Sequence, residues 1–226
     1  MPIRFYFPST GNFQQCQPAF NSSWSSNVKH NTTGAFRLRM TTVKGSDAIT
    51  LSPIFNVSAT AGGTHLSRQY ISDALWGDQV INGTVSGQLA VRHEAGTDNM
   101  DVIIPVLRVI DNKGTSVRGT LLNSGSYGGS EGTDFISTSS STRNKRIYTG
   151  QSVTPVNALD GDRIVLELGC GHTAAGTTPQ YRCRYGTNAP DLPSNDETVT
   201  TDGAGWFQFN NVNLMFKKNI NCATEG

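Results

Sequence analysis

The strongest constraint on the fold is a succession of short apolar runs in which hydrophobic and polar residues alternate. Residues 35–40 alternate cleanly, with Phe36, Leu38 and Met40 on a different face from Arg37 and Arg39. Similar runs recur along the chain between glycine-rich breaks, and strong helical periodicity is absent. The pattern therefore predicts many short strands joined by turns.

The composition supports this interpretation. The chain has 226 residues, of which 24 are glycine and only 15% are charged, and Ser, Thr and Asn are abundant, as turns require. Hydrophobic residues make up 36% and gather in short runs, which argues against disorder. About ten strands at this spacing predict an all-β, jelly-roll-like antiparallel β-sandwich. Because neither an internal repeat nor a linker interrupts it, we expect a single domain over 1–226.

Several segments carry sharper local predictions. Residues 80–92 are predicted as one long strand, bulged at its glycines. Residues 102–110 form a further strand, which Pro105 marks as an edge or irregular strand. The turn signal at 111–114 leads into residues 117–122, so a hairpin is expected there.

Charge and hydropathy bound the possible partners. A net charge of +1 gives no global field that would attract nucleic acid or an anionic membrane. The N-terminus lacks the pattern of a signal peptide, and no run approaches the length of a membrane span. We therefore expect a soluble chain. If it leaves the cell, we expect it to do so without a signal peptide, for example by lysis.

Four cysteines, Cys16, Cys170, Cys183 and Cys222, allow three pairings. Residues 171–182 look like a hairpin connection, which would place Cys170 opposite Cys183. Cys16 and Cys222 would then join the two ends of the domain. We predict these two disulfides. The alternative, typical of a cytosolic protein, is four reduced and buried thiols.

Sequence signatures of catalysis are missing. The chain has no Gly-x-Ser-x-Gly, no phosphate-binding loop, and no histidine spacing of the kind that binds a metal. We therefore predict a protein that is not an enzyme and needs no cofactor.

Two binding sites can nevertheless be proposed. Asp191, Asp196 and Glu197 form the densest acidic segment and could supply oxygen ligands to calcium, although a solvated turn with a proline-stiffened backbone is the favoured interpretation. Trp76 precedes Gly77-Asp78, so it is expected to be exposed at a turn, where it could stack on a sugar ring. Trp206, by contrast, is predicted to lie in the core.

Several segments, taken in order, carry a resemblance over almost the whole chain. They are residues 4–9, 18–20 followed by Trp24, 68–73, 84–88, 114–122, 160–165, 191–193 and 197–206. This series resembles a poorly characterised group of proteins encoded by tailed bacteriophages, and the four cysteines are a departure from the usual pattern of that group.

The resemblance implies a virion structural protein: a capsid decoration (cement) protein, or a head or tail accessory subunit. Its partners would be the major capsid or tail proteins and further copies of itself, and its place would be the virion. Residues 1–34 are then a candidate for an extended arm that contacts neighbouring subunits, the alternative being a loop packed on its own domain. A different class of function, a lectin-like receptor-binding domain for cell-surface glycans, would use Trp76.

Overall fold

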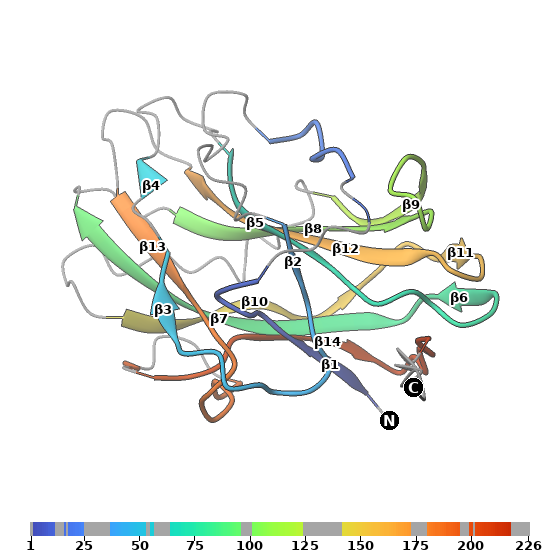
Figure 1. Cartoon of the computed structure of the whole chain (residues 1–226). Helices are drawn as coiled ribbons and strands as arrows, with labels where there is room; N and C mark the ends of the chain where they lie inside the picture. The colour runs from blue at the N-terminus through green and yellow to red at the C-terminus, as the bar shows by residue number, and fades with distance from the viewer. Residues whose placement is uncertain are drawn as a thin grey trace, which may run out of the picture.

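The computed structural model describes residues 2–11, 16, 18–24, 37–52, 55–56, 64–95, 101–123, 142–172, 180–194, 199–200 and 202–217. Their regular structure consists of β-strands, which confirms the predicted all-β class (Figure 1). Fourteen strands are formed in this part of the chain, more than the ten expected, because several have only two or three residues. No helix in the described ranges is long and apolar enough to cross a membrane.

One layer of the sandwich is a seven-stranded sheet, here called sheet A. Its central strand β7 is long and pairs with strands on both of its sides. The order is β1 (Ile3–Tyr6), β14 (Trp206–Asn210), β7 (Thr84–Ala95), β13 (Gln180–Tyr185) and β3 (Thr50–Leu51), with β10 (Thr142–Ser152) on β7 and β4 (Phe55–Asn56) on β13.

The other layer is a five-stranded sheet, here called sheet B. Its order is β2 (Arg37–Arg39), β5 (Thr64–Ile71), β12 (Arg163–His172), β8 (Asp101–Ile110) and β9 (Val117–Leu122). All its pairs are antiparallel except that of β2 with β5. A separate two-stranded ribbon joins β6 (Gln79–Ile81) to β11 (Val156–Ala158).

The core lies between the two sheets and is rich in aromatic side chains. Phe7 and Tyr70 have ring centroids 5.1 Å apart, and Tyr70 and Tyr185 follow at 5.9 Å. Leu38 and Met40 are buried in the same core, as their alternation with arginine predicts. Two layers that close over a shared apolar core make a β-sandwich; the jelly-roll connectivity stays a prediction.

The single long strand predicted over 80–92 is divided in two. Gly83 has a φ of +87°, a left-handed conformation that allows a tight turn between β6 and β7. β6 therefore joins the small ribbon while β7 enters sheet A. The glycine marked a change of sheet, where the sequence suggested only a bulge.

β8, predicted as an edge or irregular strand, is an inner strand of sheet B. Pro105 is nevertheless tolerated, because the register with β9 covers only Leu107–Ile110 on that side of β8. Pro105 itself faces Leu168 of β12. It lies beyond the paired part of β9, where a missing N–H costs no ladder bond to that strand. The hairpin from β8 to β9 is formed as predicted.

The hairpin predicted around Cys170 and Cys183 is wrong. Cys170 lies in β12, which pairs with β5 and β8 in sheet B, whereas Cys183 lies in β13, which pairs with β7 in sheet A. The chain therefore crosses from one layer to the other between these strands.

The described part of 1–34 packs on its own domain. β1 is an edge strand of sheet A, and Tyr6 exchanges backbone hydrogen bonds with Thr41. Residues 18–24 cover the outer face of sheet B, where Trp24 packs on Leu66 and Val106 (Figure 1). The described residues of 1–34 therefore make the contacts expected of a segment packed on its own domain, the alternative to an extended arm.

Candidate functional site

Four large hydrophobic side chains are exposed on segments that meet at one end of the sandwich. The exposed fractions are 59% for Trp76, 56% for Val80, 44% for Leu159 and 50% for Met215. We call these four residues the Trp76 end. The predicted exposure of Trp76 at a turn is confirmed, as is the burial of Trp206 in the fold.

Gln79 ties the segments of the Trp76 end together. Its amide nitrogen donates to the carbonyl oxygens of Trp76, at 2.9 Å, and of Met215, at 2.8 Å. Its amide oxygen accepts the backbone N–H of Met215 at 3.0 Å, and the N–H of Trp76 donates to the Met215 carbonyl. The side-chain amide of Gln79 thus fixes the turn of Trp76 against the segment that holds Met215.

Asp160 fixes the segment that carries Leu159, between β11 and β12, in the same way. Its carboxylate accepts the backbone N–H of Gly77 and the ammonium group of Lys217, both at 2.7 Å. The bond from Lys217 and the bond from Gly77 hold the pKa of Asp160 below its usual value. The hydrogen bonds of Gln79 and Asp160 therefore hold the three segments of the Trp76 end together. The four apolar side chains are exposed on these connected segments.

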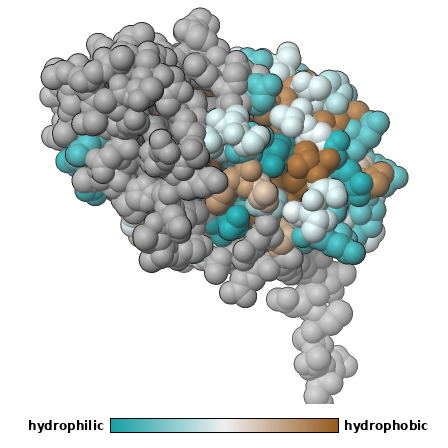
Figure 2. All heavy atoms as spheres, turned by 90° about the horizontal axis from the view of Figure 1, so that it is seen from above, coloured by the Kyte–Doolittle hydropathy of each residue, from teal (hydrophilic) through white to brown (hydrophobic). Residues whose placement is uncertain are grey.

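Figure 2 shows one face of the molecule, with hydrophobic atoms exposed among hydrophilic ones on the right. This is the side that carries β6, β9 and β11 in Figure 1. Scattered exposed hydrophobic residues are ordinary, but several large ones on connected, hydrogen-bonded loops mark a candidate contact surface.

The acidic segment predicted to bind calcium is only partly described. Asp191 forms ion pairs with Arg4 and Lys44, and Tyr6 donates to the same carboxylate at 3.3 Å. Arg4 also lies 4.0 Å from the centroid of the Trp206 ring. The carboxylate therefore fastens β1 to two loops of its own domain.

Asp196 and Glu197 lie outside the described residues, so the calcium site stays a prediction. Within the described ranges, no three His, Cys, Asp or Glu side chains form a group that could hold a metal ion.

The Asp191 ion pairs should make stability depend on pH. Burial raises the pKa of Asp191, but hydrogen bonds and charge from Lys44 and Arg4 outweigh it and leave the pKa below its usual 3.8. A lowered folded-state pKa stabilises the fold above the unfolded pKa and ceases to do so as pH falls below about 4. Asp191→Asn should therefore cost about 0.5–1 kcal/mol at pH 7 in urea unfolding, and the difference from the wild type should close between pH 4 and pH 2.

Asp202→Asn is the matched control for this experiment. Its carboxylate is 71% exposed and meets Arg184 at 3.4 Å, so no measurable difference is expected at either pH. If Asp191→Asn left the same deficit at pH 2 as at pH 7, the loss would not come from the ionised carboxylate.

Sequence reasoning missed a buried ionic cluster on the outer face of sheet B. Glu167 is fully buried and forms an ion pair with Arg108, which is also buried. Gln69 donates to Glu167 at 2.9 Å, and the backbone N–H of Asn21 donates at 3.1 Å. The indole N–H of Trp24 donates to the same carboxylate. This cluster holds residues 18–24 onto the sheet and is closed to solvent, so it acts on stability.

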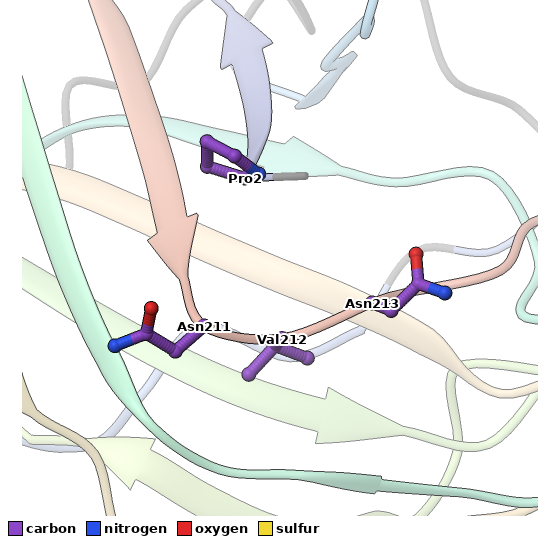
Figure 3. Close-up of a pocket in the computed structure, with 4 residues that line it drawn as sticks. All are labelled: Pro2, Asn211, Val212 and Asn213. Carbon is purple, nitrogen blue, oxygen red and sulfur yellow. The ribbon is translucent and has the colours of Figure 1, made fainter.

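A hollow of about 410 Å³ lies where β1 begins and β14 ends. Figure 3 shows Pro2 on one side and Asn211, Val212 and Asn213 on the other. Asn211 adopts a φ of +61° and turns the chain there. Among the described residues that line it, the hollow has two side-chain amides and no charged or nucleophilic side chain, so these residues supply no group for acid–base or covalent chemistry.

The described cysteines are buried thiols. Cys16 packs with Ile71, Ile110 and Val165, and burial raises its pKa. Its predicted partner, Cys222, lies outside the described residues. Cys170 and Cys183 belong to the core between the sheets. Both disulfides stay predictions.

The sequence matches no protein-family model and no curated protein. Among solved structures, it is similar to a CocE/NonD family hydrolase from Staphylococcus aureus, with 12% identity, a TM-score of 0.29, and coverage of 92% of this chain and 34% of that one. It is also similar to infectious bursal disease virus, Gx strain, with 10% identity, a TM-score of 0.23, and coverage of 72% and 39%. The chain spans little more than a third of the length of these two structures, and TM-scores this low establish neither a shared fold nor a shared function.

Proposed function

We propose that this chain is a non-enzymatic structural component of a phage virion, either a capsid decoration protein or a head or tail accessory subunit. The proposal starts from the resemblance of the sequence to the phage-encoded group. A rigid β-sandwich suits such a role, because many identical copies on one particle turn modest contacts into stable attachment.

The observation that carries the proposal is the Trp76 end. Exposed tryptophan is the residue type that most often dominates a protein–protein contact, since it buries a large area with little loss of conformational freedom. The bonds from Gln79 and Asp160 fix its loop before any partner arrives, which lowers the entropic cost of binding.

The same tryptophan supports a second candidate, a lectin-like domain that binds glycans. An aromatic ring exposed at 59% offers a face for a sugar ring. Sugar binding also requires polar groups aimed at the ligand. Around Trp76, Gln79 and Asp160 use polar atoms to bind neighbouring loops, which favours an apolar protein contact over a sugar.

The proposal predicts that Trp76→Ala reduces attachment to particles. Virus particles purified from the source of the chain, analysed by quantitative mass spectrometry, should contain it at many copies per particle. Complementation with Trp76→Ala should lower its occupancy on the particle about tenfold or more, because a central tryptophan typically contributes more than about 1.4 kcal/mol to binding.

Val43→Ala is the matched control, since Val43 is exposed at 75% and lies beside Lys44, which forms an ion pair with Asp191. Its occupancy should equal that of the wild type. Absence of the chain from particles would contradict the virion role, and a glycan-array signal abolished by Trp76→Ala would then establish the second candidate. Equal occupancy of Trp76→Ala and wild type would place the particle contact elsewhere on the domain.

A further inference from the structure

Cys170 and Cys183 meet across the core of the sandwich. Cys170 belongs to β12 in sheet B and Cys183 to β13 in sheet A. Both sulfurs are buried, and the two side chains are hydrogen-bonded to each other. The pair therefore joins β12 of sheet B to β13 of sheet A. In the described residues these two strands share no backbone ladder, since β12 pairs with β5 and β8, and β13 with β3, β4 and β7.

Polar groups surround this pair inside an otherwise apolar core. Ser67 and Tyr185 share a hydrogen bond of 2.6 Å, and both hydroxyls reach Cys183. The guanidinium group of Arg68 lies 4.1 Å from the centroid of the Tyr185 ring. It donates to the carbonyl oxygens of Pro8 and Ser9. A cation and two hydroxyl groups thus stand beside one of the two sulfurs.

This environment favours ionisation of Cys183. Hydrogen bonding to Cys170 lowers the pKa of Cys183 most, burial opposes it, and Tyr185, Ser67 and Arg68 lower it further. The thiolate is the form of cysteine that attacks a disulfide or a peroxide. Cys183 can therefore attack an oxidant, and its hydrogen-bonded neighbour Cys170 can resolve the intermediate.

We propose that Cys170 and Cys183 form a redox-controlled lock between the two sheets, a dithiol in a reducing cell and a disulfide in an oxidising medium. The inference does not depend on the virion role. It places the predicted Cys170–Cys183 bond between the layers, where it would hold the sandwich closed.

The reaction with a small-molecule disulfide, such as oxidised glutathione, balances in two steps. The Cys183 thiolate attacks one sulfur of the oxidant, forming a mixed disulfide and releasing one small thiol. The Cys170 thiolate then attacks the Cys183 sulfur, forming the Cys170–Cys183 bond and releasing the second small thiol. The protein loses two electrons and two protons, and the oxidant is reduced to two thiols. Since both sulfurs are buried, the oxidant gains access when the sheets open or before they close during folding.

The test uses the full chain carrying Cys16→Ser and Cys222→Ser, so that only the pair of interest remains. The chain is refolded from urea with oxidised glutathione, and in parallel with reductant. Trypsin cuts after Arg163, Arg182 and Arg184, so the bond joins peptide 164–182 to Cys183-Arg184. The oxidised chain should yield this linked product and melt about 6–12 °C above the reduced chain.

Cys170→Ser and Cys183→Ser in this background are the matched controls. Each should lack the linked peptide and show the same Tm with and without reductant. Refolding without the linked peptide, although oxidant had full access to the unfolded chain, would overturn the proposal. A linked chain that melts at or below the temperature of the reduced one would also overturn it, because the bond would then not lock the fold.

Discussion

Glu167→Ala is expected to lower the free energy of unfolding by about 3–5 kcal/mol, because it leaves a buried cation without its partner. Arg108 is buried and loses its carboxylate. The N–H groups of Asn21 and Trp24 lose their acceptor in the same change. Urea unfolding followed by circular dichroism measures the loss, which should appear as a lower midpoint at an unchanged slope.

Two further variants identify the cause of that loss. The double variant Glu167→Met, Arg108→Met removes both charges and should recover part of the stability, because no unpaired charge remains. Asp160→Ala removes an exposed ion pair with Lys217 and an exposed bond from the N–H of Gly77, and should lower the free energy of unfolding far less than Glu167→Ala. A loss at Glu167 no larger than that at Asp160 would show that the buried pair contributes no more than a surface one.

The position of Glu167 shows where sequence reasoning stops. Residues 163–168 alternate as a strand should, and a charged residue in such a run is expected to face solvent. In the structure that face is covered by residues 18–24, more than 140 positions earlier in the chain. Nothing local in the sequence indicates which strand a distant loop will cover, so the ion pair could not be predicted.

Local alternation, by contrast, was a sufficient guide to the class of fold. Leu38 and Met40 are buried and the arginines between and before them are not, as their period of two requires. What alternation cannot give is the sheet to which each strand belongs. The segments holding Cys170 and Cys183 look like a hairpin because they are close in sequence, yet each finds its partners in a different layer.

The candidate site was predictable only in part. Trp76 could be placed at an exposed turn because Gly77-Asp78 follows it. The neighbours Leu159 and Met215 come from segments about 80 and 140 residues away, and they reach Trp76 through bonds that Gln79 and Asp160 make. The exposure of Trp76 could therefore be predicted from the sequence, whereas the residues that surround it could not.

Gly186→Ala is expected to lower the free energy of unfolding by about 3 kcal/mol or more, because the added methyl group both overpacks its surroundings and strains the backbone. Gly186 has a φ of +140°, which a residue with a Cβ rarely adopts. An added Cβ would overlap the carbonyl of Ala48 and lie 2.7 Å from the Cα of Ile49. This neighbouring backbone cannot easily withdraw, because the carbonyl of Asp47 accepts the N–H groups of Thr187 and Asn188. Calorimetry should show a fall in Tm of about 6–12 °C.

Gly150→Ala separates the two contributions. Gly150 also has a positive φ, of +67°, but an added Cβ there would meet nothing within 4 Å. Its substitution should therefore cost only the conformational penalty, about 1 kcal/mol. The difference between the two losses in free energy of unfolding therefore measures how closely the 47–49 loop packs against the end of β13. Equal losses at both glycines would mean that the 47–49 loop can move enough to accept a methyl group. The loop would then be held less tightly against the sandwich than its hydrogen bonds imply.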